Sequence, residues 1–419
     1  MLLSVGFSEI KKTLLLVWLA LMFVIPKEYG LAKGFILLCI CILSFIYILR
    51  EKKINIRECG YFFCFIIYFL SSILYGVVSG WKFDITQDYP LFFYYVFTPI
   101  CVFLFGYLYQ NNKIFIVKIC ICMTAIISFL DLIRIFMILG ILPKVGIIDF
   151  IVRVDSENTL MNELTLRISN ESSLIFLLPL NILFLTLPRD DQRLSWKYKI
   201  GIVVASVLGS GYAMLSGRRI LEIGVLIAWL IVCSKFLLQR FSVASLLKGG
   251  IFVGAFLLII SYIFETIVSN SDLSNLSDMI INTFFEGFTG AGMQNRQSYI
   301  PGLIELWETA PIFGHGLNAY GNVLANWQTL WSYEVVFLAL LGQAGIIGVF
   351  IILLGVFFVL ASYFNIYKST KSNWIKALYK AMAIASVIFV LAGLSNPQVY
   401  YAWFWGIFFT FSKVGEYDV

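Results

Sequence analysis

Long apolar stretches recur along almost the whole chain and carry the first structural prediction. A helix that crosses a membrane needs about 20 mostly apolar residues, because each residue adds 1.5 Å to its length. Stretches that approach this length predict helices over residues 13–26, 34–49, 60–79, 89–109, 114–139, 171–188, 200–216, 220–238, 247–268, 333–364, 377–396 and 398–413. The pattern therefore predicts an all-α polytopic membrane protein with about twelve transmembrane helices.

One apolar stretch, 333–364, is longer than the rest and contains Gly342, Gly345 and Gly348. Glycines at this spacing predict a kinked or broken helix. With this helix placed tenth, the chain divides into transmembrane helices one to nine over residues 1–268, a long polar-rich loop over 269–332, and the last helices over 333–419.

The loop 269–332 is predicted to be ordered and to carry short helices. Its middle, from Arg296 to Glu308, has helical apolar spacing, which is typical of an amphipathic helix lying on a membrane face. Pro311 and the glycines of the following Gly314-His-Gly316 predict a turn. Loops of this length are usually either functional or disordered, and the Trp and Tyr content of this one favours order.

The charges give the predicted orientation. Basic segments at 50–57, 189–199, 235–240 and 368–376 all fall on one side when the helix count is twelve. Because cytoplasmic loops of membrane proteins are rich in Lys and Arg, both termini are expected in the cytoplasm and the loop 269–332 on the opposite side.

Composition excludes several classes of function. Hydrophobic residues make up 60% of the chain and charged residues only 13%, whereas a soluble domain carries about 25% charged residues. The net charge of +6 is explained by the cytoplasmic Lys and Arg and does not predict a nucleic-acid surface. A single His leaves no cluster for a transition metal, so neither a metal nor another cofactor is expected.

Three arginines are candidates for binding an anion on the outer side. Arg218 and Arg219 lie at the predicted outer turn between two helices, against the trend of the other basic pairs. A guanidinium group matches phosphate oxygens in a bidentate manner. The alternative is a helix-end Arg that reaches lipid headgroups or pairs with Glu222. Arg296 opens the helical part of the loop, and its alternative is a solvated loop charge.

Two further elements of the outer side could act on a sugar. Glu334 begins the tenth helix and could accept a proton as general base, or it could be a helix N-terminal carboxylate favoured by the dipole. The Gly314-His-Gly316 turn could bring backbone N–H groups to an anion or sugar. His315 could be a base or a hydrogen-bonded loop residue.

Taken together, these residues resemble the superfamily of O-antigen polymerases and O-antigen ligases of bacterial inner membranes. The resemblance covers the whole chain in topology. Locally, Leu215-Ser-Gly-Arg-Arg219 is similar to a Ser-rich turn that ends in Arg. Arg296, Trp307, Pro311 and Gly314-His-Gly316 follow the order of a second family motif. Glu334 followed by Gly345-Ile-Ile-Gly348 fits the spacing of a third, although the ligases carry a His and a small polar residue where this chain has Glu334 and Val335.

This departure favours a polymerase of the Wzy type over a ligase. The resemblance implies a metal-independent glycosyltransferase with the glycosyltransferase-C type of fold and a periplasmic active site. Its donor and acceptor would be glycans on undecaprenyl diphosphate, and its expected partners are membrane lipid and a Wzz-type chain-length regulator. The implied catalytic residues are Glu334, Arg219, Arg296 and His315, and the implied substrate-binding residues are Arg218, Gly314, Gly316, Asn318, Tyr320 and Tyr333.

Two alternatives stay open. A ligase or a capsule polysaccharide polymerase would share the same superfamily. A flippase or other transporter would belong to a different class. Asp131 and Arg134, one turn apart in a predicted helix, are either a structural ion pair or part of a transport path.

Overall fold

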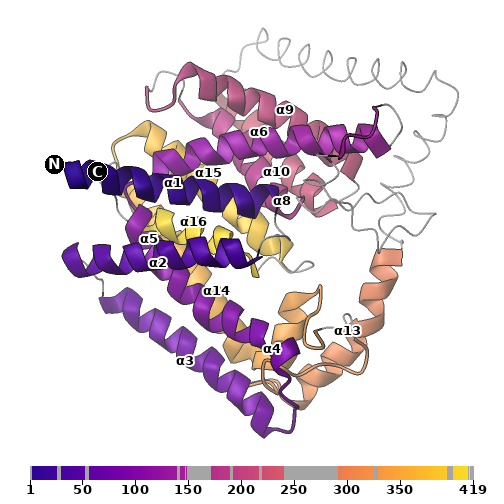
Figure 1. The fold of residues 1–419 in the computed structure, drawn as a ribbon. Coiled ribbons are helices and arrows are strands. Elements are labelled where there is room, and N and C mark those ends of the chain that lie inside the picture. The colour runs from indigo at the N-terminus through magenta and orange to yellow at the C-terminus, as the bar shows by residue number, and fades with distance from the viewer. Residues whose placement is uncertain are drawn as a thin grey trace, which may run out of the picture.

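The computed structural model of the chain consists of helices and connecting loops, with no β-strand in the part that it describes. The described residues are 2–25, 30–51, 56–138, 142–146, 148, 171–188, 192–216, 219–239, 291–324, 329–393, 400–413 and 415. Figure 1 shows the helices packed side by side in one bundle, with α13 at the end away from both chain termini.

The α-helices of the described part are α1 (Leu2–Val24), α2 (Gly30–Glu51), α3 (Ile56–Val78), α4 (Ile85–Phe92), α5 (Thr98–Tyr109), α6 (Lys113–Ile138), α8 (Glu171–Leu183), α9 (Trp196–Ser216), α10 (Arg219–Gln239), α13 (Ala291–Thr309), α14 (Val336–Ser369), α15 (Asn373–Ala392) and α16 (Ala402–Ser412). A π-helix, η1 (Phe93–Phe97), joins α4 to α5, and a 3-10 helix, η3 (Phe184–Thr186), extends α8.

Six segments within the described residues are long and apolar enough to cross a membrane: Gly30–Arg50, Gly60–Val78, Ile85–Tyr109, Lys113–Met137, Val336–Ser369 and Asn373–Ala392. Two shorter apolar helices cover Ser172–Thr186 and Ala402–Ser412. The fold therefore fits an α-helical polytopic membrane protein. The predicted helix 247–268 lies outside the described residues, and the number of twelve stays a prediction.

The predicted helix 89–109 is divided into three pieces. Pro90 lies inside α4 and Pro99 lies at the start of α5, with η1 between them. Proline lacks a backbone N–H and its ring pushes against the preceding turn, so a widened π-helical turn can absorb the strain. Directly before α4, the Asp84 side chain caps the helix by accepting the N–H of Thr86 over 2.8 Å.

The centre of the bundle is formed by helices that are apolar on every side. The α8 side chains are buried from Leu174 to Leu183, and every α16 residue from Ala402 to Ser412 is buried except the half-buried Trp405. By contrast, α3, α10 and α14 expose large apolar side chains such as Phe63, Leu230 and Phe357. This arrangement is expected when lipid rather than water surrounds the outer helices.

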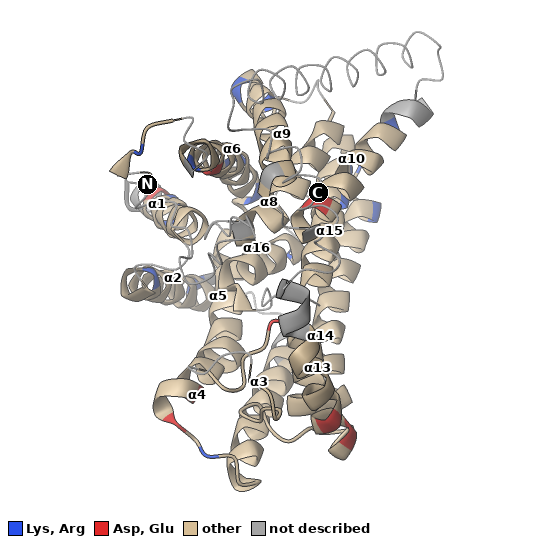
Figure 2. Ribbon diagram, turned by 90° about the vertical axis from the view of Figure 1, so that its right-hand side faces the viewer, with Lys and Arg blue, Asp and Glu red and all other residues tan. Residues whose placement is uncertain are grey.

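The helix ends gather at two poles of the bundle. At one pole the Tyr109 hydroxyl donates to the Lys11 carbonyl over 2.9 Å, and Lys113 Nζ donates to the Tyr379 hydroxyl over 2.7 Å. We call this the basic pole, because the side chains described there include Lys11, Lys12, Lys113, Lys118, Arg193, Lys197, Lys199, Lys235, Lys368, Lys371, Lys376, Lys380 and Lys413. Figure 2 shows the ribbons mostly tan, with the charged residues near helix ends.

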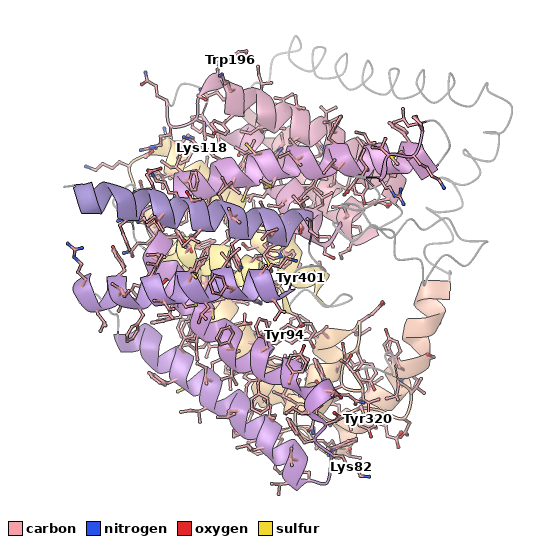
Figure 3. All side chains as sticks on the ribbon, viewed as in Figure 1. Lys82, Tyr94, Lys118, Trp196, Tyr320 and Tyr401 are labelled. Atoms are coloured by element: carbon pink, nitrogen blue, oxygen red, sulfur yellow. The ribbon has the colours of Figure 1, made fainter. Side chains whose placement is uncertain are left out.

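The opposite pole, here the cap pole, consists of residues 76–88, α13, the segments 310–324 and 329–335, and the first turns of α14. The predicted loop helix over Arg296–Glu308 is confirmed as part of α13. Its Leu303 is fully buried, in a cluster with Tyr299, Tyr333 and Ala339. Figure 3 places Tyr320 and Lys82 at this pole, away from Lys118 and Trp196.

Candidate functional site

The predicted break in the long helix is confirmed at Gly345. This residue has φ 66° and ψ −174° inside α14, and the axis kinks there. A break leaves carbonyl groups before it and N–H groups after it without helical partners, which is costly away from water.

The segment 311–316 supplies these missing partners. It lies against the break and exchanges backbone hydrogen bonds with it in both directions. Ile346 N–H donates to the Pro311 carbonyl (3.0 Å), Ile347 N–H to Ile312 (3.2 Å), His315 N–H to Gly342 (3.0 Å) and Gly316 N–H to Gln343 (2.7 Å). We call this double pairing the loop–helix joint. It connects the cap to the membrane helix at a fixed place.

Three glycines make the joint possible. Gly314, Gly316 and Gly345 have φ values of 70°, 106° and 66°, a region that side chains disfavour. A Cβ on Gly345 would overlap the Ile312 carbonyl, and one on Gly316 would overlap the backbone of Gly76 in α3. The motif glycines therefore permit close backbone packing.

This geometry corrects one prediction. The backbone N–H groups of Gly314-His-Gly316 were expected to face an anion or a sugar. Gly314 N–H donates to the Ala310 carbonyl over 3.0 Å, and the other two donate to α14. Because all three are already used within the chain, the turn holds the loop in place and does not form an anion-binding nest.

Side chains from α3 and α14 strengthen the joint. The Tyr68 hydroxyl donates to the Ala344 carbonyl over 2.6 Å, next to the break. Gln343 is 1% exposed, and its Nε2 donates to the carbonyls of Ala319 (2.9 Å) and Trp331 (2.8 Å). One amide thus fixes both ends of the loop 319–331. Gln343 was not among the residues predicted from the sequence, although a lone amide in an apolar helix is a visible signal.

Asn318, a predicted substrate-binding residue, lies in the interior. It is 3% exposed, and its side-chain oxygen packs against Gly76 of α3. Its neighbour is Asp88, also 3% exposed, which accepts the N–H of Asp84 over 3.0 Å. Asn318 is thus enclosed at the cap pole, and its predicted contact with a substrate stays a prediction.

The contacts of Tyr333 are also made within the chain. It is 2% exposed, and its hydroxyl accepts the N–H of Gly321 (2.9 Å) and donates to the Val323 carbonyl (3.3 Å). Burial raises the pKa of the Tyr333 phenol, against the opposing effect of the Gly321 hydrogen bond. Its place in the predicted substrate-binding set is not supported, because the ring and the hydroxyl are both enclosed.

Tyr320, in contrast, is half-buried and forms part of an aromatic surface. Its ring meets the edge of Trp81 with centroids 4.7 Å apart. Nearby, Asn322 Nδ2 donates to the Glu305 carboxylate over 3.2 Å, and both of these side chains are exposed. We call Trp81, Tyr320, Glu305 and Asn322 the polar–aromatic surface of the cap pole. The sequence analysis had selected only Tyr320 from it.

His315 is half-buried and forms a hydrogen bond with Thr309 at the end of α13. The His315 Nε2 and Thr309 Oγ1 atoms are 2.8 Å apart. The Thr309 hydroxyl also donates to the Leu306 carbonyl over 3.0 Å, and it has a single proton. The Thr309 side chain thus holds the imidazole against the end of α13.

Glu334 is half-buried at the cap pole, directly before α14. Its backbone carbonyl accepts the N–H of Val336 over 3.0 Å at the first turn of the helix. Glu334 thus lies at the start of the helix that takes part in the loop–helix joint. The first α14 residue of that joint, Gly342, follows Glu334 by eight positions. Glu334, His315 and Tyr320 all belong to the cap pole, and their placement on an outer membrane face stays a prediction.

The three candidate arginines are not placed by the structure. Arg218 lies outside the described residues, and so do the side chains of Arg219, at the start of α10, and Arg296, within α13. Their proposed contact with a phosphate stays a prediction. Among the described residues, no group of three His, Cys, Asp or Glu side chains is arranged to hold a metal ion.

Comparison of the chain with protein-family models, with curated proteins and with solved structures finds no match. The similarity to O-antigen polymerases and ligases thus rests on the residues and the topology described above.

Proposed function

We propose that the chain is an O-antigen polymerase, which joins undecaprenyl-diphosphate-linked oligosaccharide repeat units at the periplasmic face of a bacterial inner membrane. The observation that carries the proposal is the loop–helix joint. It supports an ordered cap next to Glu334, and the joint is built from the glycines of the motifs that resemble the superfamily.

The charge distribution supports the proposed orientation. Lys and Arg side chains gather at the basic pole, whereas the described cap pole carries few, such as Lys82. By the positive-inside rule the basic pole would face the cytoplasm. Glu334 and the polar–aromatic surface would then face the periplasm, where lipid-linked repeat units are exposed after translocation.

The proposed reaction is an attack of a sugar hydroxyl on an anomeric carbon. The acceptor oxygen forms a bond to that carbon, and the bond from the carbon to the diphosphate oxygen breaks. Undecaprenyl diphosphate leaves with the electron pair, while the acceptor proton passes to the Glu334 carboxylate. Positive charge from Arg218, Arg219 and Arg296 would stabilise the leaving diphosphate.

The polar–aromatic surface suits the sugars of the substrate. An aromatic ring such as Tyr320 can pack against the apolar face of a sugar, while Glu305 and Asn322 can accept and donate hydrogen bonds to hydroxyl groups. His315, held by Thr309, is a second candidate base on the same pole. An O-antigen ligase or a capsule polymerase would use the same features with another acceptor.

A flippase is the second candidate, and one observation favours it. Asp131 in α6 is 0% exposed, with Arg134 one turn further along. Ionisable side chains within transmembrane helices often line a path for ions or substrates. We prefer the polymerase, because a transport mechanism accounts neither for the cap nor for its residues that resemble the family motifs.

Deletion of the gene followed by electrophoresis of the surface glycan tests these functions against one another. Loss of a polymerase leaves the lipid core with a single repeat unit. Loss of a ligase leaves bare core and polymer on the carrier lipid, and loss of a flippase leaves no translocated units. Only the first pattern agrees with the proposal.

A further inference from the structure

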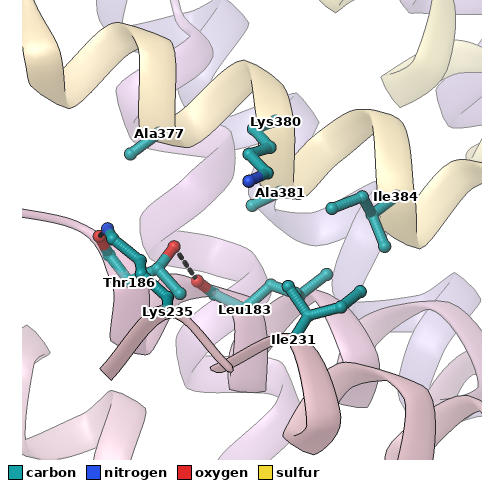
Figure 4. Close-up of a pocket in the computed structure, with 8 residues that line it drawn as sticks. All are labelled: Leu183, Thr186, Ile231, Lys235, Ala377, Lys380, Ala381 and Ile384. Atoms are coloured by element: carbon teal, nitrogen blue, oxygen red, sulfur yellow. Dashed lines mark hydrogen bonds between the residues drawn. The ribbon is translucent and has the colours of Figure 1, made fainter. Parts of the chain in front are cut away.

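A cavity opens between α8, α10 and α15 on the side of the basic pole. Figure 4 shows its lining, which includes Leu183, Thr186, Ile231, Lys235, Lys380 and Ile384. Its volume is about 50 Å³, several times the roughly 10–15 Å³ that a single water molecule requires. The glycan chemistry proposed for the cap pole makes no use of it.

Two ammonium groups and several apolar side chains line this cavity. Lys235 Nζ donates to the Thr186 carbonyl over 2.6 Å, which fixes the ammonium at the wall. An ammonium has three N–H donors, so two remain for another acceptor. Lys380 on α15 lines the same cavity, so two like charges share it. Because no carboxylate is among the described side chains that line the cavity, an anion would relieve this repulsion.

Neighbouring side chains indicate the depth of the cavity in a bilayer. The Arg193 guanidinium lies 5.2 Å from the Trp374 ring centroid, and Lys118 lies 5.3 Å from that of Tyr198. Aromatic and basic residues of this kind concentrate at the membrane–water interface. Lys380 follows Trp374 on α15 by about 9 Å of helix, so the cavity lies where headgroups meet acyl chains.

We propose that this cavity binds the phosphate of an anionic phospholipid. The two lysines would bind the phosphate oxygens, while Leu183, Ile231 and Ile384 would contact the adjoining acyl chain. Basic pockets between transmembrane helices on the cytoplasmic side commonly bind anionic headgroups. A soluble phosphate would use only the lysines and gain nothing from the apolar wall.

Native mass spectrometry of the full chain released from nanodiscs tests the proposal. The discs contain phosphatidylcholine with increasing phosphatidylglycerol, and retained phosphatidylglycerol is the readout. The test variant is Lys235→Gln with Lys380→Gln. The matched control is Lys197→Gln with Lys371→Gln, which removes the same charge from two lysines at the same pole that do not line the cavity.

The proposal predicts that wild type and control retain phosphatidylglycerol equally. Retention should be roughly five-fold weaker for Lys380→Gln alone and about thirty-fold weaker for the double variant. Lys235→Arg with Lys380→Arg should keep retention. Equal retention by the double variant and the control would overturn the site. Displacement of the lipid by inorganic phosphate at equal concentration would overturn the lipid as its occupant.

Discussion

The backbone N–H of Gly316 donates to the carbonyl of Gln343 over 2.7 Å, two residues before the helix breaks at Gly345. This bond links a loop outside the bundle to the interior of its longest helix. Gly316 in the loop and Gly345 in α14 therefore have one shared structural role. They let two backbones approach closely, and through α14 they set the position of Glu334.

Gly345→Ala should weaken the fold at the cap pole. The methyl group would overlap the Ile312 carbonyl, and a non-glycine residue at this φ would be strained by about 1–3 kcal/mol. The midpoint of thermal unfolding in detergent should fall. The matched control is Gly211→Ala in α9, where a Cβ meets nothing within 4 Å and helix propensity gains roughly 1 kcal/mol. A Gly345→Ala protein as stable as this control would refute the joint.

Gln343→Met should destabilise the same region for a different reason. Methionine fits the volume of glutamine but cannot donate to the carbonyls of Ala319 and Trp331, which are then left without that donor. An unsatisfied buried carbonyl costs about 1–3 kcal/mol. Limited proteolysis of the loop 319–331 should become faster than in wild type. Unchanged proteolysis would show that this amide does not hold the loop.

Glu334→Gln should lower the rate of glycan joining by about 10²–10⁴-fold, the usual contribution of a general base. Glu334→Asp keeps the carboxylate and should retain more activity. Protein amount and thermal stability, measured in parallel, separate a lost base from a misfolded chain. Equal activity of all three proteins would remove Glu334 as the base, and the same pair of measurements on His315→Gln would then test His315.

Arg219→Ala and Arg296→Ala should each lower the rate by roughly 10²–10³-fold, if each arginine stabilises the leaving diphosphate. The corresponding Lys variants keep the charge but lose the bidentate geometry, so they should fall in between. The readout is the ladder of surface glycan in a deletion strain that carries each variant. A wild-type ladder from either Ala variant would exclude that arginine from the diphosphate site.

Tyr320→Ala should raise KM for the glycan substrate by about five-fold with little change in kcat, because an aromatic contact away from the reacting atoms contributes roughly 1 kcal/mol to binding. Tyr320→Phe keeps the ring beside Trp81 and should behave like wild type. A change confined to kcat would contradict a binding role of the polar–aromatic surface.

Much of the fold could be predicted from apolar periodicity. The predicted helices 60–79, 200–216 and 377–396 agree with α3, α9 and α15 within a few residues, because lipid requires long apolar helices. The break in α14 was also visible from its glycines. The docking of residues 311–316 onto that break was not, since no local pattern reports a contact between segments that far apart in sequence.

The candidate site was predicted less well, and for a physical reason. Residue type alone cannot tell an exposed Asn, Tyr or N–H group from a buried one. Asn318 and Tyr333 are buried within the cap, and the N–H groups of Gly314-His-Gly316 bond within the chain, whereas Tyr320 and Glu334 are partly exposed. Trp81 and Glu305 join the site only through tertiary packing.

Glycan extension by the purified protein tests the central proposal most directly. The full chain, reconstituted in liposomes with undecaprenyl-diphosphate-linked repeat units as the sole glycan, should produce a ladder of longer lipid-linked glycans, and the Glu334→Gln protein should not. Folded wild-type protein that leaves the repeat units unjoined, while moving them between leaflets or transferring them to lipid core, would contradict the assignment as a polymerase.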